Sequence, residues 1–213
     1  MTNICLADRQ DITRAGLMYI CQEMGATQWK YTEDKAELIE RLKAFPDSVV
    51  VMDYTTFDIN DADELLILCQ RFRYARWILF SEDLSTDFVR RLIASWALIS
   101  VVLKESPLRE IRESIDYAIR GQRYICQRMT ELLLAPSAVV EEEVKLTNTE
   151  REVLKDIALG MTTKEIAEKR FSSFHTINTH RKNIFRKLGV NNVHEATKYA
   201  LRAGLIDSAE YYI

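Results

Sequence analysis

Short apolar runs alternate with amphipathic segments along the first part of the chain. Five runs rich in aliphatic and aromatic residues have the length of strands, at residues 3–7, 28–31, 48–52, 76–80 and 99–103, with the weakest pattern at 28–31. In the segments between and after them, apolar residues recur at helical spacing, over 11–24, 33–45, 61–72, 86–97 and 108–119. This alternation predicts an α/β doubly wound domain over residues 1–120, with a parallel five-stranded sheet and helices on both faces.

The last third of the chain predicts helices without strands. Two capping boxes open the first two helices, with the sequences TNTE at 147–150 and TTKE at 162–165. Ser173 is the expected N-cap of a third helix, and a fourth spans about 193–203. Short helices joined by tight turns indicate an all-α helix-turn-helix domain over residues 146–213.

Residues 121–145 join the two predicted domains. Helical spacing continues over 124–134, whereas 135–145 read APSAVVEEEVK, with a proline and three successive glutamates. That composition predicts an exposed, flexible linker after a last helical segment.

Composition narrows the class of protein. The chain has 47% hydrophobic and 29% charged residues, the balance of a globular protein. No apolar run approaches the ~18 residues of a membrane span, and the N-terminal residues lack the pattern of a secretory signal. The four cysteines form no CxxC pair and are expected to be core residues in a reducing compartment. We expect a cytoplasmic protein that is not bound to a membrane.

The distribution of charge points to an anionic partner for the C-terminal domain. The whole chain has a net charge of −3, yet residues 146–213 hold 11 Lys and Arg against 8 Asp and Glu. Between Lys169 and His194 there are six basic residues and no acidic one. Double-stranded DNA is the first candidate, and a solvated charged helix face is the alternative.

The third C-terminal helix has two distinct faces on a helical wheel. Ile177, Ile184 and Leu188 cluster on the side expected to face the core. The opposite face carries hydrogen-bonding side chains suited to base edges or phosphates, with Thr179, Lys182 and Arg186 outward, Asn178 and Asn183 at the margins, and Arg181 beside the apolar face.

Polar residues stand where four of the predicted strands end. Asp8, Asp53, Ser81 and Lys104 each follow an apolar run directly. The carboxyl ends of parallel strands meet at one edge of the sheet, so these side chains are expected to share a pocket. Two carboxylates, a hydroxyl and an ammonium suit a carboxylate that accepts a phosphoryl group. Taken singly, each residue is more often a strand-end cap or a solvated turn residue.

With these residues, positions 1–120 resemble the receiver domain of bacterial two-component response regulators. The resemblance implies that Asp53 is the phosphoacceptor and that Asp8 and Asp53 hold Mg²⁺. It also implies that Ser81 is the switch hydroxyl, that Lys104 pairs with the phosphoryl group, and that a sensor histidine kinase is a partner.

The receiver pattern is incomplete in this chain. Arg9 stands where the family has a second acid, Val101 replaces the aromatic switch residue, and Glu105 replaces the proline after the lysine. Mg²⁺ needs carboxylate oxygens, and Arg9 removes such a ligand and adds a positive charge. We expect weak Mg²⁺ binding and slow or absent phosphorylation, with Arg9 a candidate partner for Asp8 or Asp53.

The C-terminal domain resembles the LuxR-type DNA-binding domain without a gap. The match runs from LTNTEREVLKDIALGMTTKEIAEK through HTINTHRKNIFRKLGV to EATKYA, and with the receiver it gives the pattern of the NarL/FixJ class of response regulators. Arg170 and Ser172 stand where apolar residues are usual. The resemblance implies contacts to bases from Asn178, Thr179 and Lys182, and contacts to phosphates from Lys164, Thr176 and Lys187.

The leading hypothesis is a sequence-specific transcription regulator, not an enzyme, with a degenerate phosphoacceptor site. An alternative keeps DNA binding and makes the receiver a phosphorylation-independent module for dimerisation or ligand sensing. A third, an aspartyl-phosphate enzyme with Asp53 as nucleophile, lacks a proton donor nearby.

Tight binding to two half-sites predicts a homodimer. The last helix carries a stripe of Val193, Ala196, Thr197 and Ala200. This stripe either pairs across a two-fold axis or packs within its own domain.

Overall fold

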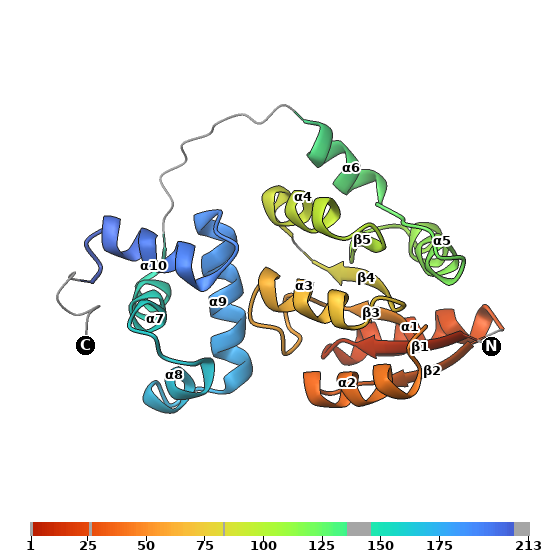
Figure 1. Ribbon diagram of the computed structural model, residues 1–213, viewed down its shortest axis with the longest axis horizontal. Coiled ribbons are helices and arrows are strands. Elements are labelled where there is room, and N and C mark those ends of the chain that lie inside the picture. Colours follow the sequence, from red (N-terminus) through yellow and green to blue (C-terminus); the bar gives the residue numbers. More distant parts are fainter. Residues whose placement is uncertain (1, 26, 83, 136–145, 207–213) are drawn as a thin grey trace. The chain divides into compact units, whose positions relative to one another are not determined.

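The computed structural model describes residues 2–25, 27–82, 84–135 and 146–206 (Figure 1). They form two compact units, one made mostly of residues up to Ala135 and the other mostly of residues from Leu146 onward. The strands lie in the first unit, and the second is helical. The first unit continues past position 120, where the α/β domain was expected to end. None of the described helices is long and apolar enough to cross a membrane.

The first unit contains the predicted parallel sheet. Its strands are β1 (Thr2–Ala7), β2 (Thr27–Tyr31), β3 (Val49–Met52), β4 (Arg76–Ser81) and β5 (Ile99–Leu103). They pair in parallel in the order β2-β1-β3-β4-β5. The side chains of β3 and β5 are buried along their whole length, which is why these strands read as continuous apolar runs. The α/β prediction is confirmed.

Helices connect the strands and cover the sheet. They are α1 (Asp11–Glu23), α2 (Lys35–Ala44), α3 (Ala62–Arg71), α4 (Thr86–Ser95) and α5 (Leu108–Ile119). Side chains start two of them: Asp34 accepts a hydrogen bond from the Glu37 amide, and Ser85 from the Phe88 amide. Helical connections between parallel strands bring the carboxyl ends of all strands to one edge of the sheet.

The segment after α5 closes the exposed edge of β5. The Val101 amide donates to the carbonyl of Tyr124 at 2.9 Å, and the Val101 carbonyl accepts from the Cys126 amide at 2.9 Å. The hydroxyl of buried Ser100 also accepts from the Tyr124 amide at 3.0 Å. Both backbone groups of Val101 are thereby paired, so the edge strand presents a covered edge at this point.

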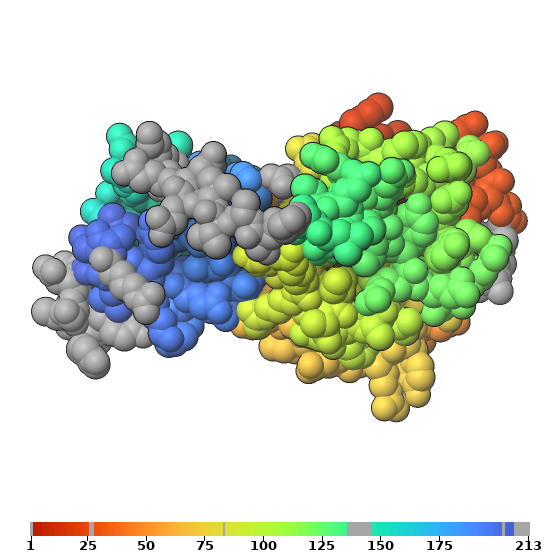
Figure 2. Space-filling model, turned by 90° about the horizontal axis from the view of Figure 1, so that it is seen from above, coloured from red at the N-terminus to blue at the C-terminus, as the bar shows by residue number. Residues whose placement is uncertain are grey.

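Helix α6 (Gln127–Leu134) then packs on α4 and β5. Figure 2 shows α6, in green, beside the yellow-green α4. Met129 is fully buried there. The N-terminal Gln127 amide donates to a carboxylate oxygen of Glu110 on α5 at 3.1 Å. Near the other end, Arg90 on α4 donates to the Leu133 carbonyl at 2.9 Å. An acid at the N-terminus and a base at the C-terminus complement the helix dipole.

The second unit has the predicted helix-turn-helix arrangement. Its helices are α7 (Asn148–Ala158), α8 (Thr163–Lys169), α9 (Phe174–Leu188) and α10 (Val193–Arg202). Both capping boxes have their two reciprocal hydrogen bonds. Ser173 caps α9 by accepting from the Thr176 amide, and Gly189 ends the helix with a φ of 65°.

The small-residue stripe of α10 packs inside its own domain. Ala196 and Ala200 are fully buried in the core of the helical unit, and Thr197 is 6% exposed. Val193 packs against the same core, and α7 is the main neighbour of α10. The dimer interpretation of this stripe is therefore wrong, because small side chains serve here to bring α10 close to α7.

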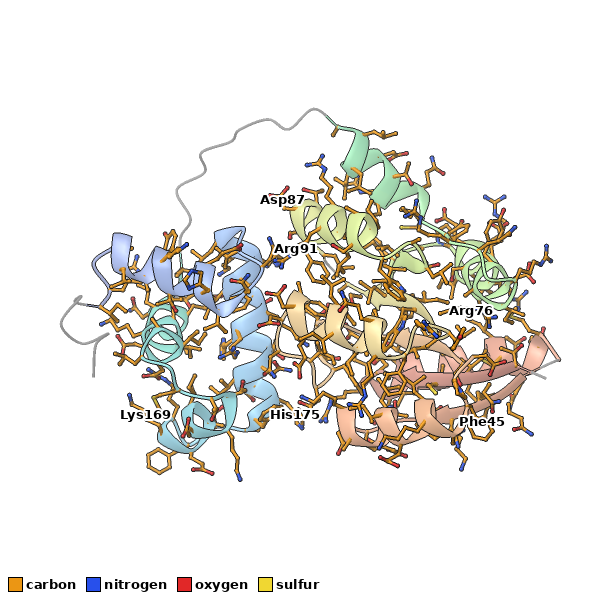
Figure 3. All side chains as sticks on the ribbon, viewed as in Figure 1. Phe45, Arg76, Asp87, Arg91, Lys169 and His175 are labelled. Atoms are coloured by element: carbon orange, nitrogen blue, oxygen red, sulfur yellow. The ribbon has the colours of Figure 1, made fainter. Side chains whose placement is uncertain are left out.

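A buried carboxylate explains the unusual Arg170. Asp156 on α7 is 2% exposed. It accepts hydrogen bonds from Arg170 Nε at 2.6 Å and from Lys169 Nζ at 2.7 Å, and Figure 3 shows Lys169 on α8. The arginine thus supplies the charge that a buried acid on the facing helix requires.

Candidate acceptor site and DNA-binding surface

The four predicted strand-end residues come together at one edge of the sheet. Lys104 lies between the two carboxylates, with Nζ 2.9 Å from Asp8 Oδ2 and 2.9 Å from Asp53 Oδ2. The exposed fractions of the three side chains are 10% for Lys104, 1% for Asp8 and 2% for Asp53. Gln10 Oε1 accepts a further hydrogen bond from Lys104 Nζ at 2.9 Å. One buried cation therefore serves two buried acids.

Asp53 is also held by the loop that follows it. The Thr55 amide donates to Oδ1 at 2.9 Å, and the Thr56 hydroxyl donates to Oδ2 at 2.8 Å. Together with Lys104, these groups give the carboxylate three donors. These donors stabilise the negative charge of the carboxylate and fix its orientation.

The pKa directions follow from the same contacts. Burial disfavours the charged form of Asp53, but Lys104, Thr56 and Thr55 outweigh it and lower the pKa from 3.8. For Asp8, burial outweighs the hydrogen bonds from Lys104 and the Gln10 amide, and the pKa is raised from 3.8. Burial also opposes the charge of Lys104, but Asp53 and Asp8 outweigh it and raise the pKa from 10.5. Asp8 is thus the first of the two acids to take up a proton as the pH falls.

Ser81 contacts the backbone beside Asp53. Its hydroxyl, fully buried, accepts from the Tyr54 amide at 3.0 Å. The Tyr54 ring in turn stacks on Phe88 of α4, with 4.4 Å between ring centroids. The Ser81 hydroxyl thus engages the amide that follows the acceptor carboxylate, and an aromatic stack packs behind that amide.

Arg9 makes a contact away from the two acids. Its Nη2 donates to the Glu33 carbonyl at 2.9 Å, in the loop after β2. The cation between Asp8 and Asp53 is Lys104, a role for which Arg9 was also a candidate.

The described residues do not fit a resident Mg²⁺. Magnesium requires several oxygen ligands in octahedral geometry. No group of three or more His, Cys, Asp or Glu side chains among the described residues is placed to hold a metal ion. Asp8 and Asp53 both face the ammonium of Lys104 instead, which lies between them and offsets one of their two negative charges.

The predicted DNA contacts lie on α8 and α9 of the helical unit. Lys164 is exposed in the first turn of α8, and Thr176 is exposed in the first turn of α9. Asn178, Thr179 and Lys182 follow within the next two turns of α9, where Thr179 is half-buried, whereas Asn178 and Lys182 are buried, although Lys182 was expected to face outward. This is the part of a helix-turn-helix unit that enters the major groove.

Two basic residues of α9 are engaged within the domain. The Arg181 guanidinium lies 5.8 Å from the ring centroid of Phe185, a core residue, in agreement with its expected place beside the apolar face. Lys187 Nζ lies 2.7 Å from Glu150 Oε2 on α7.

Comparisons with known proteins agree with this architecture. The family model of bacterial regulatory proteins of the luxR family (GerE) matches residues 144–200. The transcriptional regulatory protein LiaR of Bacillus subtilis is 27% identical over 97% of this chain and 100% of its own length. The RcsB response regulator of Salmonella typhimurium has a similar fold, with a TM-score of 0.57 and 22% identity over 93% of this chain and 97% of that one. Residues 144–200 thus match the luxR family, and over almost its whole length the chain is similar to transcriptional regulatory proteins such as LiaR.

Other similar proteins have the same two-domain length. The oxygen regulatory protein NreC of Staphylococcus aureus is 24% identical over 96% of this chain and 99% of its own length. A solved structure of two RcsB dimers bound to two parallel DNAs has a TM-score of 0.57 and 24% identity, over 93% of this chain and 97% of that one.

Sequence reasoning missed several residues of the acceptor site. Gln10, Thr55 and Thr56 follow Asp8 or Asp53 by two or three positions and contact Lys104 or Asp53. A signal was available at Asp53, since a carboxylate commonly accepts from the amide two residues later in the chain. The contact of Gln10 with Lys104 depends on the sheet order, which brings β1 and β5 ends within reach.

Replacing Lys104 with Met tests the charge balance of the acceptor site. We expect the free energy of unfolding at pH 7 to fall by about 3–5 kcal/mol, because two buried carboxylates lose their shared cation. In the unmodified protein, the contribution of Asp53 is present above pH 3.8 and is lost as the pH falls through its lowered pKa. The contribution of Lys104 is present below pH 10.5 and is lost as the pH rises through its raised pKa.

Urea unfolding between about pH 5 and pH 7 measures the effect. Stability of Lys104→Met should rise as the pH falls, because its two acids take up protons more readily when no cation is near. Lys30→Met, at an exposed position of β2, is the matched control. Equal losses in the two variants would contradict the assigned role of Lys104.

Proposed function

We propose that this response regulator binds specific double-stranded DNA sites and regulates transcription without phosphorylation at Asp53. The observation that carries the second part is the ammonium of Lys104, which bridges Asp8 and Asp53 at 2.9 Å each. The cation supplies one of the two positive charges that a divalent metal ion would bring to two adjacent carboxylates, and it lies between them.

Binding to DNA is supported by the matched luxR-family region and by the chemistry of α9. Thr179 and Lys182 offer a hydroxyl and an ammonium, and Asn178 offers an amide that can pair with adenine. Lys164 and Thr176 lie at helix N-terminal turns, where backbone amides favour phosphate. We therefore assign base reading to α9 and phosphate contacts to Lys164 and Thr176.

The receiver acts as a binding module rather than an enzyme or an ordinary phosphorylation switch. The groups that contact Asp53 are Lys104, Thr55 and Thr56, which stabilise its charge. Val101, at the position of the aromatic switch, has both backbone groups paired with the segment after α5. A sensor kinase and Mg²⁺ are accordingly not required for DNA binding in this proposal.

Two copies of the chain meet through the receiver in this proposal. Helix α1 presents an exposed apolar stripe, with Ile12 83% exposed, Tyr19 54% exposed, and Ala15 and Gly16 exposed between them. A groove of about 280 Å³ lies beside the stripe, between α1 and α5. An added Cβ at Gly16 would meet no atom within 4 Å, so a facing helix can approach closely. Such a patch can pair with its own copy across a two-fold axis.

Two lysines separate base reading from phosphate contact. Lys182→Ala should weaken specific binding by about 1–3 kcal/mol and change the sequence preference, because a base contact is lost. Lys164→Ala should weaken binding to all duplexes about equally and make the salt dependence shallower by about one ion. Titration of labelled specific and random duplexes at several salt concentrations measures both. Identical behaviour of the two variants on both duplexes would refute the assignment.

Incubation with a small-molecule phosphodonor and Mg²⁺ tests the receiver. We expect no added phosphoryl mass on the intact protein and unchanged DNA affinity, because Lys104 and the loop already satisfy Asp53. Arg9→Asp should raise Mg²⁺ affinity, measured by calorimetry, since it adds a carboxylate ligand. Rapid labelling that disappears in Asp53→Ala, with a matching gain in DNA affinity, would contradict the proposal and show that phosphorylation of Asp53 controls DNA binding.

A charge placed on α1 tests the dimer surface. Ile12→Glu should shift the protein from dimer to monomer in sedimentation measurements, because an isologous contact brings two of the new carboxylates into one apolar interface. Ile67→Glu on α3, where Ile67 is 62% exposed, is the matched control and should leave the dimer intact. An unchanged dimer in Ile12→Glu would place the contact elsewhere.

A further inference from the structure

An ion pair between Lys187 and Glu150 joins the end of α9 to the start of α7. Lys187 lies in the last turn of α9, and its Nζ is 2.7 Å from Glu150 Oε2. The same oxygen accepts from the Thr147 amide at 2.8 Å, as the reciprocal half of the first capping box. One carboxylate oxygen thus accepts hydrogen bonds from a residue at the start of α7 and from a residue at the end of α9.

Burial makes this contact different from an ordinary surface ion pair. The Glu150 side chain is 7% exposed, and that of Lys187 is 29% exposed. Burial tends to raise the pKa of Glu150, but hydrogen bonds from Lys187 and Thr147 outweigh it and lower the pKa from 4.5. A phosphate that drew Lys187 away would leave a charged, buried carboxylate without its cation, which is costly.

The second capping box offers an internal comparison. Glu165 accepts from the amide and hydroxyl of Thr162 in the same way, yet it is exposed at the surface of α8. The capping function therefore does not itself require a lysine. At Glu150 the cation is needed because that carboxylate is buried against α9.

We propose that Glu150 is a positioning residue for DNA binding, which withholds Lys187 from the phosphates and fixes the end of α9 to the start of α7. This inference rests on the proposed DNA binding and reverses the role that the family resemblance implies for Lys187. Binding to DNA of any sequence depends on the number of phosphates neutralised. By masking one lysine, Glu150 lowers affinity for random DNA and leaves the base-reading face of α9 untouched.

The salt dependence of binding to a random duplex tests the inference with full-length variants. Glu150→Gln keeps an acceptor for the Thr147 amide, since glutamine also serves in capping boxes, and removes the charge that holds Lys187. We expect the slope of log affinity against log salt to steepen by about 0.9, so that the affinity lost between 50 and 200 mM salt grows about 3.5-fold. Lys187→Met should leave the slope unchanged, and the Glu150→Gln, Lys187→Met double variant should return to the unmodified slope.

Glu165→Gln is the matched control, because it removes the same charge from the other capping box and releases no lysine. A shallower slope in Lys187→Met would overturn the inference, since it would show that Lys187 neutralises a phosphate despite Glu150. Equal slopes for Glu150→Gln and Glu165→Gln would overturn it as well. If the unmodified protein bound no duplex at any salt, the proposed function itself would fail. Thermal unfolding of each variant reports its folding, and the double variant, which buries no charge at this contact, guards against a misfolded single variant.

Discussion

The ammonium of Lys104 is the contact on which the regulatory domain depends. Parallel pairing of β1 with β3 places Ala7 beside Met52, so that Asp8 and Asp53 emerge next to each other from the sheet. Two buried carboxylates at that spacing repel each other unless a cation lies between them. Lys104, at the end of β5, supplies the cation. The sheet order thus places two like charges side by side, and Lys104 at the end of the last strand reduces their repulsion. Because this cation is part of the chain, its presence does not depend on the concentration of a metal ion.

The segment that follows α5, including α6, is also held firmly against the domain. Val101 contributes its amide and carbonyl to the segment after α5, and α6 is bonded to Glu110 at one end and Arg90 at the other. In this arrangement the edge of β5 is linked through backbone hydrogen bonds to the helix that leads out of the receiver. A rearrangement of β5 would have to break these bonds, which favours a receiver with one stable conformation.

Sequence patterns predicted the sheet, the strand-end cluster and both capping boxes because each is written in local spacing or in a topological rule. The patterns were silent on partners that lie far apart in the chain. The ion pair of Asp156 with Arg170 joins two helices, and nothing in the local sequence around either residue predicts its partner. The α10 stripe was ambiguous for a different reason, since small side chains favour close packing equally against α7 or against a second copy. Arg9 was misleading because it is adjacent to Asp8 in the sequence, whereas its side chain extends to the Glu33 carbonyl in the folded protein.

Among the described residues, ion pairs join separate elements around buried acids at three places: Lys104 with Asp8 and Asp53, Lys169 and Arg170 with Asp156, and Lys187 with Glu150. Buried pairs of this kind contribute little net stability compared with apolar residues of the same volume, but the loss of one partner is expensive. Their effect is therefore to restrict geometry: each pair permits one relative placement of its elements within its domain. In the α/β unit, the pairs of Lys104 hold the ends of β1, β3 and β5 at one spacing. In the helical unit, the pair of Lys187 with Glu150 fixes the end of α9 to the start of α7, which is the support that the proposed DNA-reading helix requires.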